Sequence, residues 1–458
     1  MIRGRLSGIA ARLHARHLGP DADFTGLTTD SRRVSAGQLF VALRGARFDG
    51  HEYVRGAARA GASAALVERY VEPGPGQLVV ADSRRGLGDL ARLWRGRFDI
   101  PVVGVTGSNG KTTVKEMLAS ILRQRGPVLA TEGNRNNDIG LPLTLCGLDG
   151  THTAAVLEMG ANHAGEIAYL AGVAQPVVGV VTNAGAAHLE GFGSREGVAR
   201  AKGELFQALP PEGCAVINAD DRYAGLWREL ASGCRSLTFG LDPGADVRSG
   251  SIGTAPVADG TPGTRFELRL PADSITVSLP LPGRHNVMNA LAAAAAALAV
   301  GVDAAGIRRG LEAMRPVTGR LQVVAGRHGA RLLDDSYNAN PNSLRAGLEV
   351  LAGLGGRTWL VLGDMGELGD GSGGLHREAG EQARGAGVER LYALGELARE
   401  TCAGFGEGAH HFDTPESLIA AVAGDLAPDV SVLVKGSRAM HMERVVQALR
   451  AEPPGGSD

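Results

Sequence analysis

Short apolar runs alternate with stretches of helical periodicity through the middle of the chain. The apolar runs cover residues 102–106, 154–158, 177–182 and 215–218. Between them, apolar side chains recur every three or four residues, as they do from residue 114 to 122. This alternation predicts a mostly parallel sheet, covered by helices on both faces, over residues 85–315.

Two smaller units flank this central region. Residues 1–84 contain β-like runs at 38–43, 64–68 and 78–81, with a helical stretch between them. From residue 316 onward the alternation resumes, with strands expected near 331–333, 358–362, 390–394 and 431–434. We therefore expect an α/β protein of three domains, spanning 1–84, 85–315 and 316–458, the last of them Rossmann-like.

One segment of the central region does not follow this alternation of apolar runs and helical stretches. Residues 242–282 are rich in Gly, Pro and Thr, and polar and apolar side chains alternate at 266–270 and 275–279. A period of two is typical of half-buried strands, so we expect an antiparallel insertion of hairpins here. The six consecutive alanines at 292–297 are expected to form a packed helix.

Composition narrows the class of protein. The chain has 458 residues and a net charge of −2, which argues against nucleic acid as the main partner. It contains no apolar run of about twenty residues, so no membrane span is expected. Its four cysteines include no Cys-x-x-Cys pair, which argues against a zinc cluster or a disulfide framework. We expect a cytoplasmic monomer with reduced thiols.

Residues 104–113 predict a phosphate-binding loop between a strand and a helix. Gly107 and Gly110 would let the backbone turn tightly and present N–H groups to phosphate at the positive end of the helix dipole. Lys111 would reach the terminal phosphates, and Thr112 would offer its hydroxyl to Mg²⁺. The usual pattern has a glycine where Val105 stands, and a glycine-rich turn before a helix is the alternative interpretation. The expected phosphate contacts are Gly107, Ser108, Asn109, Gly110, Lys111, Thr112 and Thr113.

Polar residues that follow strands are further candidates, because ligands of open parallel sheets bind there. Glu158, His188 and Lys202 are the three in the central region. Glu158 and Thr112 supply the hard oxygen ligands that Mg²⁺ prefers. The alternatives are that Glu158 caps a helix, that His188 is an ordinary loop histidine, and that Lys202 is a solvated surface lysine.

Asn286 and Asn289 open the alanine-rich helix. They lie three residues apart and therefore share one side, from which they could hydrogen-bond the edge of a base. The alternative is that Asn286 simply caps the helix N-terminus.

The third expected domain carries its own polar segments after strands, at 334–343, 363–369 and 435–438. Together they predict a second ligand that faces the nucleotide across a cleft, although an Asn-Pro turn is an alternative explanation of the first segment. Arg320 lies between the second and third expected domains, where domain closure could bring it onto a γ-phosphate.

In these motifs the sequence resembles the Mur ligases, the ATP-dependent amino-acid ligases of peptidoglycan synthesis, over nearly the whole chain. Residues 106–113 match that family's own form of the phosphate loop, which accounts for the missing glycine. Residues 30–32, 37–43 and 48–51 resemble its UDP-binding first domain. Residues 133–142 and 335–341 resemble the member that adds D-alanyl-D-alanine, and the Asp-Asn-Pro-Arg motif of the preceding ligase does not occur.

The resemblance implies a role for each candidate residue. The catalytic residues would be Lys111, Lys202, His188 and Arg320, and the ligands of two Mg²⁺ ions would include Thr112, Glu158, His188 and a carbamylated Lys202. ATP would also contact Asn286, Asn289, Arg320, Asp335, Tyr337 and Asn338. Ser31, Arg32, Asn134, Asn136 and Asn137 would bind the UDP-linked substrate.

The implied activity is the ligation of D-alanyl-D-alanine to UDP-MurNAc-tripeptide. ATP would convert the terminal carboxylate into an acyl phosphate, with Mg²⁺, Lys111 and Arg320 neutralising the charge. His188 is the candidate base for the attacking amine, and closure of the third domain would exclude water. One alternative is the preceding ligase, which adds a diamino acid to UDP-MurNAc-dipeptide. The other is a P-loop ATPase without ligase activity, in which residues 31–32 and 134–137 would have no assigned task.

Overall fold

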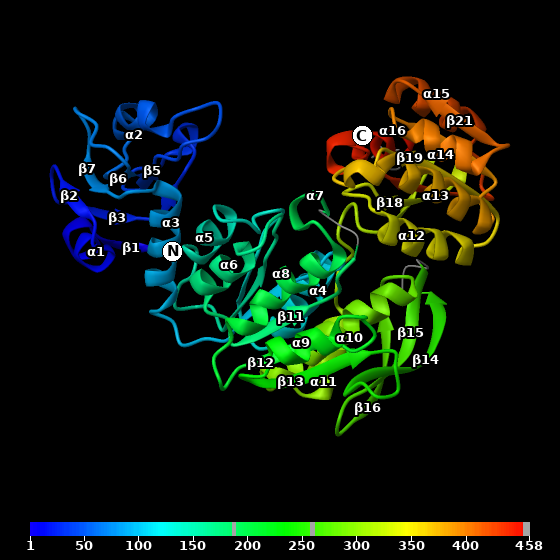
Figure 1. Ribbon diagram of the computed structural model, residues 1–458, viewed down its shortest axis with the longest axis horizontal. Coiled ribbons are helices and arrows are strands. Elements are labelled where there is room, and N and C mark those ends of the chain that lie inside the picture. The colour runs from blue at the N-terminus through cyan, green and yellow to red at the C-terminus, as the bar shows by residue number, and fades with distance from the viewer. Residues whose placement is uncertain (186–188, 257–261, 452–458) are drawn as a thin grey trace, which may run out of the picture.

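The computed structural model describes residues 1–185, 189–256 and 262–451. Figure 1 shows three α/β units in chain order, with the first (blue) and the third (yellow to red) at opposite ends of the central one. In the described residues the units contain sheets of five, nine and six strands, respectively. The expectation of an α/β protein with three domains is confirmed.

The first unit is built on a sheet with the strand order β2-β7-β6-β5-β4. Its elements are α1 Leu6–Leu13, β2 Arg16–Leu18, β4 Leu27–Thr28, β5 Leu39–Val41, α2 Val54–Arg59, β6 Ala64–Val67 and β7 Gly76–Val79, and β1 Arg3–Arg5 pairs with β3 Asp23–Thr25. The runs expected at 38–43, 64–68 and 78–81 correspond to β5, β6 and β7. Strands β1 to β4 were not predicted, because two or three residues are too few to show a period.

Helix α3 (Ser83–Arg95) connects the first unit to the second. Its first turn is capped by the Asp82 carboxylate, which accepts from the backbone N–H groups of Arg84 and Arg85. Its buried side chains join one core that includes Leu66 of the first sheet and Leu157 of the central sheet. The domain boundary expected at residue 84 therefore falls inside a helix that both units share.

The central sheet has the strand order β16-β15-β14-β13-β12-β11-β8-β10-β9. Its strands are β8 Val102–Thr106, β9 Val128–Ala130, β10 Ala154–Glu158, β11 Val178–Val181, β12 Cys214–Asn218, β13 Arg235–Gly240, β14 Val247–Pro256, β15 Pro262–Arg269 and β16 Ser274–Leu279. Neighbours from β9 to β14 run parallel, whereas β14, β15 and β16 pair antiparallel. The antiparallel insertion is confirmed, and it continues the central sheet.

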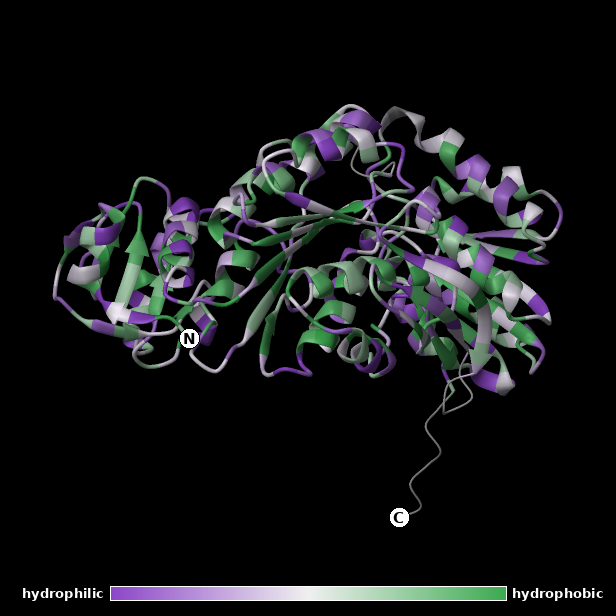
Figure 2. Ribbon diagram, turned by 90° about the horizontal axis from the view of Figure 1, so that it is seen from below, coloured by the Kyte–Doolittle hydropathy of each residue, from purple (hydrophilic) through white to green (hydrophobic). Residues whose placement is uncertain are grey.

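Successive side chains of the central strands point to opposite faces of the sheet. Val103 and Val105 pack with α4 (Lys111–Leu122), α10 (Arg284–Ala299) and α11 (Ala304–Glu312), whereas Val102 faces α3. The remaining helices are α5 Gly140–Leu145, α6 Glu166–Ala174, α7 Leu189–Phe192, α8 Arg195–Gln207 and α9 Ala224–Leu230. All six alanines at 292–297 are fully buried in α10, so the packed helix is confirmed. Figure 2 shows the strands in the middle of the molecule mostly in green, the hydrophobic colour.

Helix α11 crosses α4 at a glycine. A Cβ atom on Gly310 would lie 2.3 Å from the Cα atom and 2.7 Å from the backbone nitrogen of Ile121. Because backbone cannot move aside as a side-chain end can, we expect Gly310→Ala to destabilise the protein by about 1–3 kcal/mol and to lower its thermal unfolding midpoint. The control is Gly172→Ala in α6, where an added Cβ meets nothing within 4 Å. Equal midpoints for the two variants would contradict this close helix contact.

The third unit contains a six-stranded sheet in the order β17-β18-β22-β19-β20-β21, with only β17 antiparallel to its neighbour. Its elements are β17 Gln322–Ala325, β18 Arg331–Asp335, α12 Pro341–Gly353, β19 Arg357–Gly363, α13 Ser372–Gly385, β20 Arg390–Leu394, α14 Ala398–Phe405, β21 Ala409–Phe412, α15 Pro415–Asp425, β22 Val430–Lys435 and α16 Glu443–Leu449. The four expected strands are confirmed as β18, β19, β20 and β22. None of the helices that the structure describes is long and apolar enough to cross a membrane.

Candidate active site

The phosphate-binding loop lies where the sheet topology predicts a ligand. Strand β8 lies between β10 and β11, so the loop that follows it is flanked by the ends of both neighbours. The loop backbone has a positive φ at Gly107 (142°) and at Gly110 (82°), which is the N-cap of α4. An added Cβ on Gly110 would lie 2.4 Å from Asn289 Oδ1, so glycine is required there for conformation and for space.

Asn183, two residues after the end of β11, holds this loop in shape. The backbone N–H of Ser108 donates to the Asn183 carbonyl, and that of Asn109 donates to Asn183 Oδ1, both at 3.0 Å. The Asn183 amide donates back to the Asn109 carbonyl at 3.1 Å. The loop is therefore preformed by hydrogen bonds from a neighbouring strand end.

Lys111 folds over the loop from the first turn of α4. Its Nζ donates to the carbonyl of Gly107 at 2.7 Å and to that of Ser108 at 3.2 Å. Burial lowers the pKa of Lys111, and the nearby Glu158 carboxylate opposes that shift. The ammonium group thus lies against the loop, where anionic oxygens of a phosphate would make stronger hydrogen bonds than these carbonyls do.

Glu158 lies at the end of β10 and is only 3% exposed. Its Oε2 accepts from Thr112 Oγ1 and its Oε1 accepts from Asn136 Nδ2, both at 2.8 Å. The alternative that Glu158 caps a helix is therefore wrong. Because carboxylate and hydroxyl oxygens are hard ligands, Glu158 and Thr112 fit one side of a Mg²⁺ ion whose other ligands are phosphate oxygens and water.

In the part of the chain that the structure describes, no group of three or more His, Cys, Asp and Glu side chains could hold a metal ion. The protein ligands described so far would therefore need additional ligands from the nucleotide. His188, predicted as a metal ligand and a base, lies outside the described residues.

Lys202 on α8 is 2% exposed, so the alternative of a solvated surface lysine is wrong. Its Nζ donates to the Ala161 carbonyl at 3.3 Å and lies 5.2 Å from the ring centre of Phe192. Burial, with a smaller effect from Lys111, lowers the pKa of Lys202 to about 7. A large fraction of this amine is therefore neutral near pH 7.

Arg320 reaches the phosphate-binding loop from the segment between α11 and β17. Its Nη2 donates to Thr112 Oγ1 at 3.3 Å, and its guanidinium lies 4.1 Å from the ring centre of Tyr337. Stacking on Tyr337 fixes the plane of the guanidinium and leaves further N–H donors free. The arginine is thus held beside the hydroxyl that was predicted to bind Mg²⁺.

Asn340 connects the third unit to the same loop. Its Oδ1 accepts from the backbone N–H of Ser343 and caps α12, with Pro341 at the first helical position. Its Nδ2 donates to Asn109 Oδ1 at 2.7 Å. Asn340 and Pro341 therefore begin a helix, and the Asn340 side chain also joins two units across 231 residues of sequence.

Asp335 and Lys435 form a buried ion pair at the ends of β18 and β22. Lys435 Nζ also donates to the Asn338 carbonyl at 2.9 Å. Burial raises the pKa of Asp335 and lowers that of Lys435, and their mutual attraction opposes both shifts. The pair holds the segment that carries Tyr337 and Asn338.

Asn286 and Asn289 lie on one side of α10, as predicted. Asn289 Nδ2 donates to Asn286 Oδ1 at 3.2 Å, and Asn286 Nδ2 donates to the Pro282 carbonyl at 2.8 Å. Gly283 is the N-cap residue of α10, so the capping alternative for Asn286 is wrong. The adjacent His285 was not predicted, and its buried Nδ1 has no hydrogen-bond partner among the described residues. Burial lowers the pKa of His285 to about 4.

One cavity of about 1270 Å³ joins these elements. Its lining includes predicted residues from the central unit (Asn109, Lys111, Asn134, Asn137, Glu158, Asn289) and from the region after it (Arg320, Asp335, Tyr337, Asn338). Ser31 and Arg32 do not line it. Arg32 instead pairs with Asp30 at 2.9 Å on the surface of the first unit. A substrate role for these two residues stays a prediction.

Some lining residues were missed, and their signals differ. Asn183 could have been found, because it directly follows the predicted strand at 177–182. Asp138 also lines the cavity and lies within the segment 133–142 that the resemblance singled out, whereas Arg84, Arg85 and Tyr169 line it but carry no motif that marks them in the sequence.

Comparisons with known proteins place this geometry in a family. Three family models match: the Mur ligase family catalytic domain over 23–92, the Mur ligase middle domain over 105–297, and the Mur ligase glutamate ligase domain over 319–438. The chain belongs to the Mur ligase family. It is 43% identical to the UDP-N-acetylmuramoyl-tripeptide--D-alanyl-D-alanine ligase of Escherichia coli K12, over 98% of this chain and 99% of that protein.

Solved structures agree with this family assignment. The fold superposes on a crystal structure of MurF from Acinetobacter baumannii with a TM-score of 0.92, at 36% identity and 98% coverage of both chains. MurF from Thermotoga maritima, solved in complex with ADP, gives a TM-score of 0.84 at 32% identity, over 93% of this chain and 96% of that one. The Mur ligase architecture expected from the sequence is thus confirmed.

Proposed function

We propose that this Mur ligase joins D-alanyl-D-alanine to UDP-MurNAc-tripeptide with ATP as the energy source. The match along almost its whole length to the Escherichia coli ligase of that name supports the choice of substrates. The ADP in the Thermotoga maritima structure supports a nucleotide at the equivalent loop. Residues of the expected phosphate loop and polar residues at strand ends line one cavity, where ATP and the anionic tripeptide carboxylate would have to be brought together.

The reaction would take place between the loop and the third unit. A terminal carboxylate oxygen of the tripeptide attacks the γ-phosphorus, and ADP leaves. The amine of D-alanyl-D-alanine then attacks the acyl carbon and displaces phosphate. Lys111 and Arg320 reduce the repulsion between carboxylate and triphosphate, because both cations are held beside Thr112 and the loop. Two Mg²⁺ ions, when bound, would supply further charge neutralisation.

We also propose that Lys202 is carbamylated in the active enzyme. The nitrogen of the neutral amine would bond to the carbon of CO₂ and lose one proton, so that the neutral amine becomes a carbamate anion. Its position supports this, because among the described residues Nζ has one hydrogen-bond partner, the Ala161 carbonyl, and it lies near the Phe192 ring. A carbamate there could hold the second Mg²⁺, with Glu158 and Thr112 holding the first.

Each unit has a task in this proposal. Residues 1–84 bind the UDP end through Ser31 and Arg32, and residues 85–315 bind ATP. Residues 316–458 close over the nucleotide and the amine. His188 is the candidate base that removes a proton from the attacking amine. We further propose a monomer in the cytoplasm, where the four free thiols would remain reduced.

An ADP-release assay tests the proposed reaction. Purified protein receives ATP, UDP-MurNAc-tripeptide and D-alanyl-D-alanine, with each omitted in turn. We expect sustained ADP release only when all three are present. Release with UDP-MurNAc-dipeptide and a diamino acid would instead identify the preceding ligase. ATP turnover that is indifferent to every UDP-linked peptide would favour an ATPase without ligase activity.

A further inference from the structure

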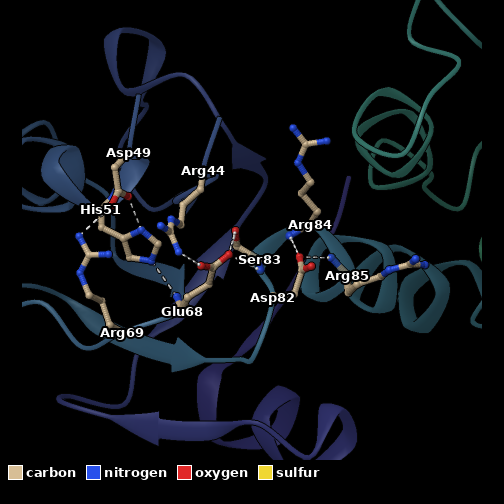
Figure 3. Close-up of polar contacts among 9 residues, drawn as sticks. All are labelled: Arg44, Asp49, His51, Glu68, Arg69, Asp82, Ser83, Arg84 and Arg85. Atoms are coloured by element: carbon tan, nitrogen blue, oxygen red, sulfur yellow. Dashed lines mark hydrogen bonds and ion pairs between the residues drawn. The ribbon is translucent and has the colours of Figure 1, made fainter. Parts of the chain in front are cut away.

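The end of the cavity nearest the first unit carries a group of charges that the mechanism does not use. Arg84 and Arg85 project from the first turn of α3, Asp138 precedes α5, and Tyr169 lies on α6. Figure 3 shows both arginine side chains pointing away from the contact between Arg44 and Glu68. All four residues line the same cavity as Lys111 and Glu158, so a ligand can extend from one end to the other.

Arg85 presents an unused hydrogen-bonding edge to this cavity. Its guanidinium lies 4.1 Å from the ring centre of Tyr169, and no hydrogen bond or ion pair engages that guanidinium within the described parts of the chain. Tyr169 is itself fixed against α3, since a Cβ on Gly88 would lie 2.1 Å from its hydroxyl oxygen. Stacking occupies one face of the guanidinium but leaves its in-plane N–H groups free for a carboxylate.

Beside Arg85, Arg84 and Asp138 form an ion pair at 3.1 Å between α3 and the segment before α5. Their side chains are 45% and 40% exposed, so both remain accessible to a ligand. This pair is weak by itself, because water screens exposed ion pairs. Asp138 can therefore accept hydrogen bonds from a second cation in addition to Arg84. Arg84 can likewise donate to a second carboxylate in addition to Asp138.

Two other nearby carboxylates, Asp82 and Glu166, already have partners. Asp82 accepts from the backbone N–H groups of Arg84 and Arg85 at the start of α3. Glu166 accepts from the backbone N–H of Asn162 at 2.7 Å and lies 3.1 Å from His163 Nδ1. Neither is hydrogen-bonded to the Arg85 guanidinium, which keeps its charge available for an external anion.

We propose that Arg85, Arg84 and Asp138 form a subsite for the side chain of the third residue of the tripeptide, and that this side chain ends in both a carboxylate and an ammonium group. The inference rests on the proposed function. The carboxylate binds the free edge of Arg85 with help from Arg84, and the ammonium binds Asp138. A diaminopimelate side chain carries both groups. A lysine side chain carries only the ammonium and leaves Arg85 without a partner.

The experiment compares two UDP-MurNAc-tripeptides, one with meso-diaminopimelate and one with L-lysine at the third position. We expect Arg85→Gln to raise KM for the diaminopimelate substrate by about tenfold or more, with little change in kcat, because a charged hydrogen bond to the substrate is lost. It should leave KM for the lysine substrate unchanged. Asp138→Asn should raise KM for both substrates, since both carry the ammonium. Arg92→Gln on the exposed side of α3 is the matched control and should behave as wild type.

Each other result contradicts the subsite. If Arg85→Gln raised KM equally for both substrates, Arg85 would bind a group common to them, such as the carboxylate of the second residue. Unchanged KM values in both Arg85→Gln and Asp138→Asn would show that the side chain does not reach this end of the cavity. If the wild type used both substrates equally well, the proposed ligase function would be supported and the proposed subsite would be contradicted. If the wild type used neither substrate, both the ligase function and the subsite would be contradicted.

Discussion

Lys111→Ala is expected to lower kcat for ADP release by about 10³-fold or more, because one preorganised cation at the transferring phosphoryl group is lost. The ammonium already lies on the loop, held by the Gly107 and Ser108 carbonyls, so it is close to where the phosphates are proposed to bind. Alanine cannot replace that charge. The rate would be measured at saturating concentrations of ATP and both other substrates.

The control for this variant is its stability. Lys111 makes its two hydrogen bonds within its own loop, so the thermal unfolding midpoint should stay near that of the wild type. A folded variant with near-normal turnover would show that the loop does not bind the reacting phosphates. The nucleotide site would then have to lie elsewhere.

The second large effect is expected at Lys202. Lys202→Ala should reduce turnover by about 10²-fold, because it removes the group proposed to become an anionic metal ligand. The side chain is buried, so its removal leaves space in which a small carboxylate can bind. Added formate or acetate should therefore restore part of the activity of this variant.

The Lys111→Ala variant is the matched control for that rescue. It loses a cation near the same site, so an added carboxylate should not restore its activity. Rescue of both variants would indicate a general salt effect. Full activity of Lys202→Ala without any added carboxylate would contradict a role for the carbamate in the mechanism.

Most of the parallel strands could be predicted, for a physical reason. Strands that are buried on both faces are nearly continuous apolar runs, which is why the ranges 102–106, 154–158 and 390–394 match β8, β10 and β20 to the residue. Strands β4, β9, β13 and β21 are parallel strands that were missed. Strand β9 has only three residues, and β13 begins with exposed polar residues.

The residues of the site likewise divide into those that the sequence places together and those that only the fold brings together. The loop glycines, Lys111 and Thr112 are consecutive, so local sequence places them together. The residues that complete the site come from distant segments. Arg320 reaches Thr112 across 208 residues, and no local pattern specifies that contact. The burial of Lys202 also follows from packing around α8, because a lone lysine in a helical stretch looks the same whether exposed or buried.

By itself, the sequence determined the α/β class, the order of the three units, the phosphate-binding loop and the family resemblance. These depend on the period of apolar side chains and on contiguous motifs, which are properties of neighbouring residues. Only the tertiary structure decided that Asn183 and Asn340 hold the loop, that α3 joins one core shared by two units, and that Arg85 stacks on Tyr169. Those contacts join segments far apart in the chain, and only the packing of helices on sheets brings such segments together.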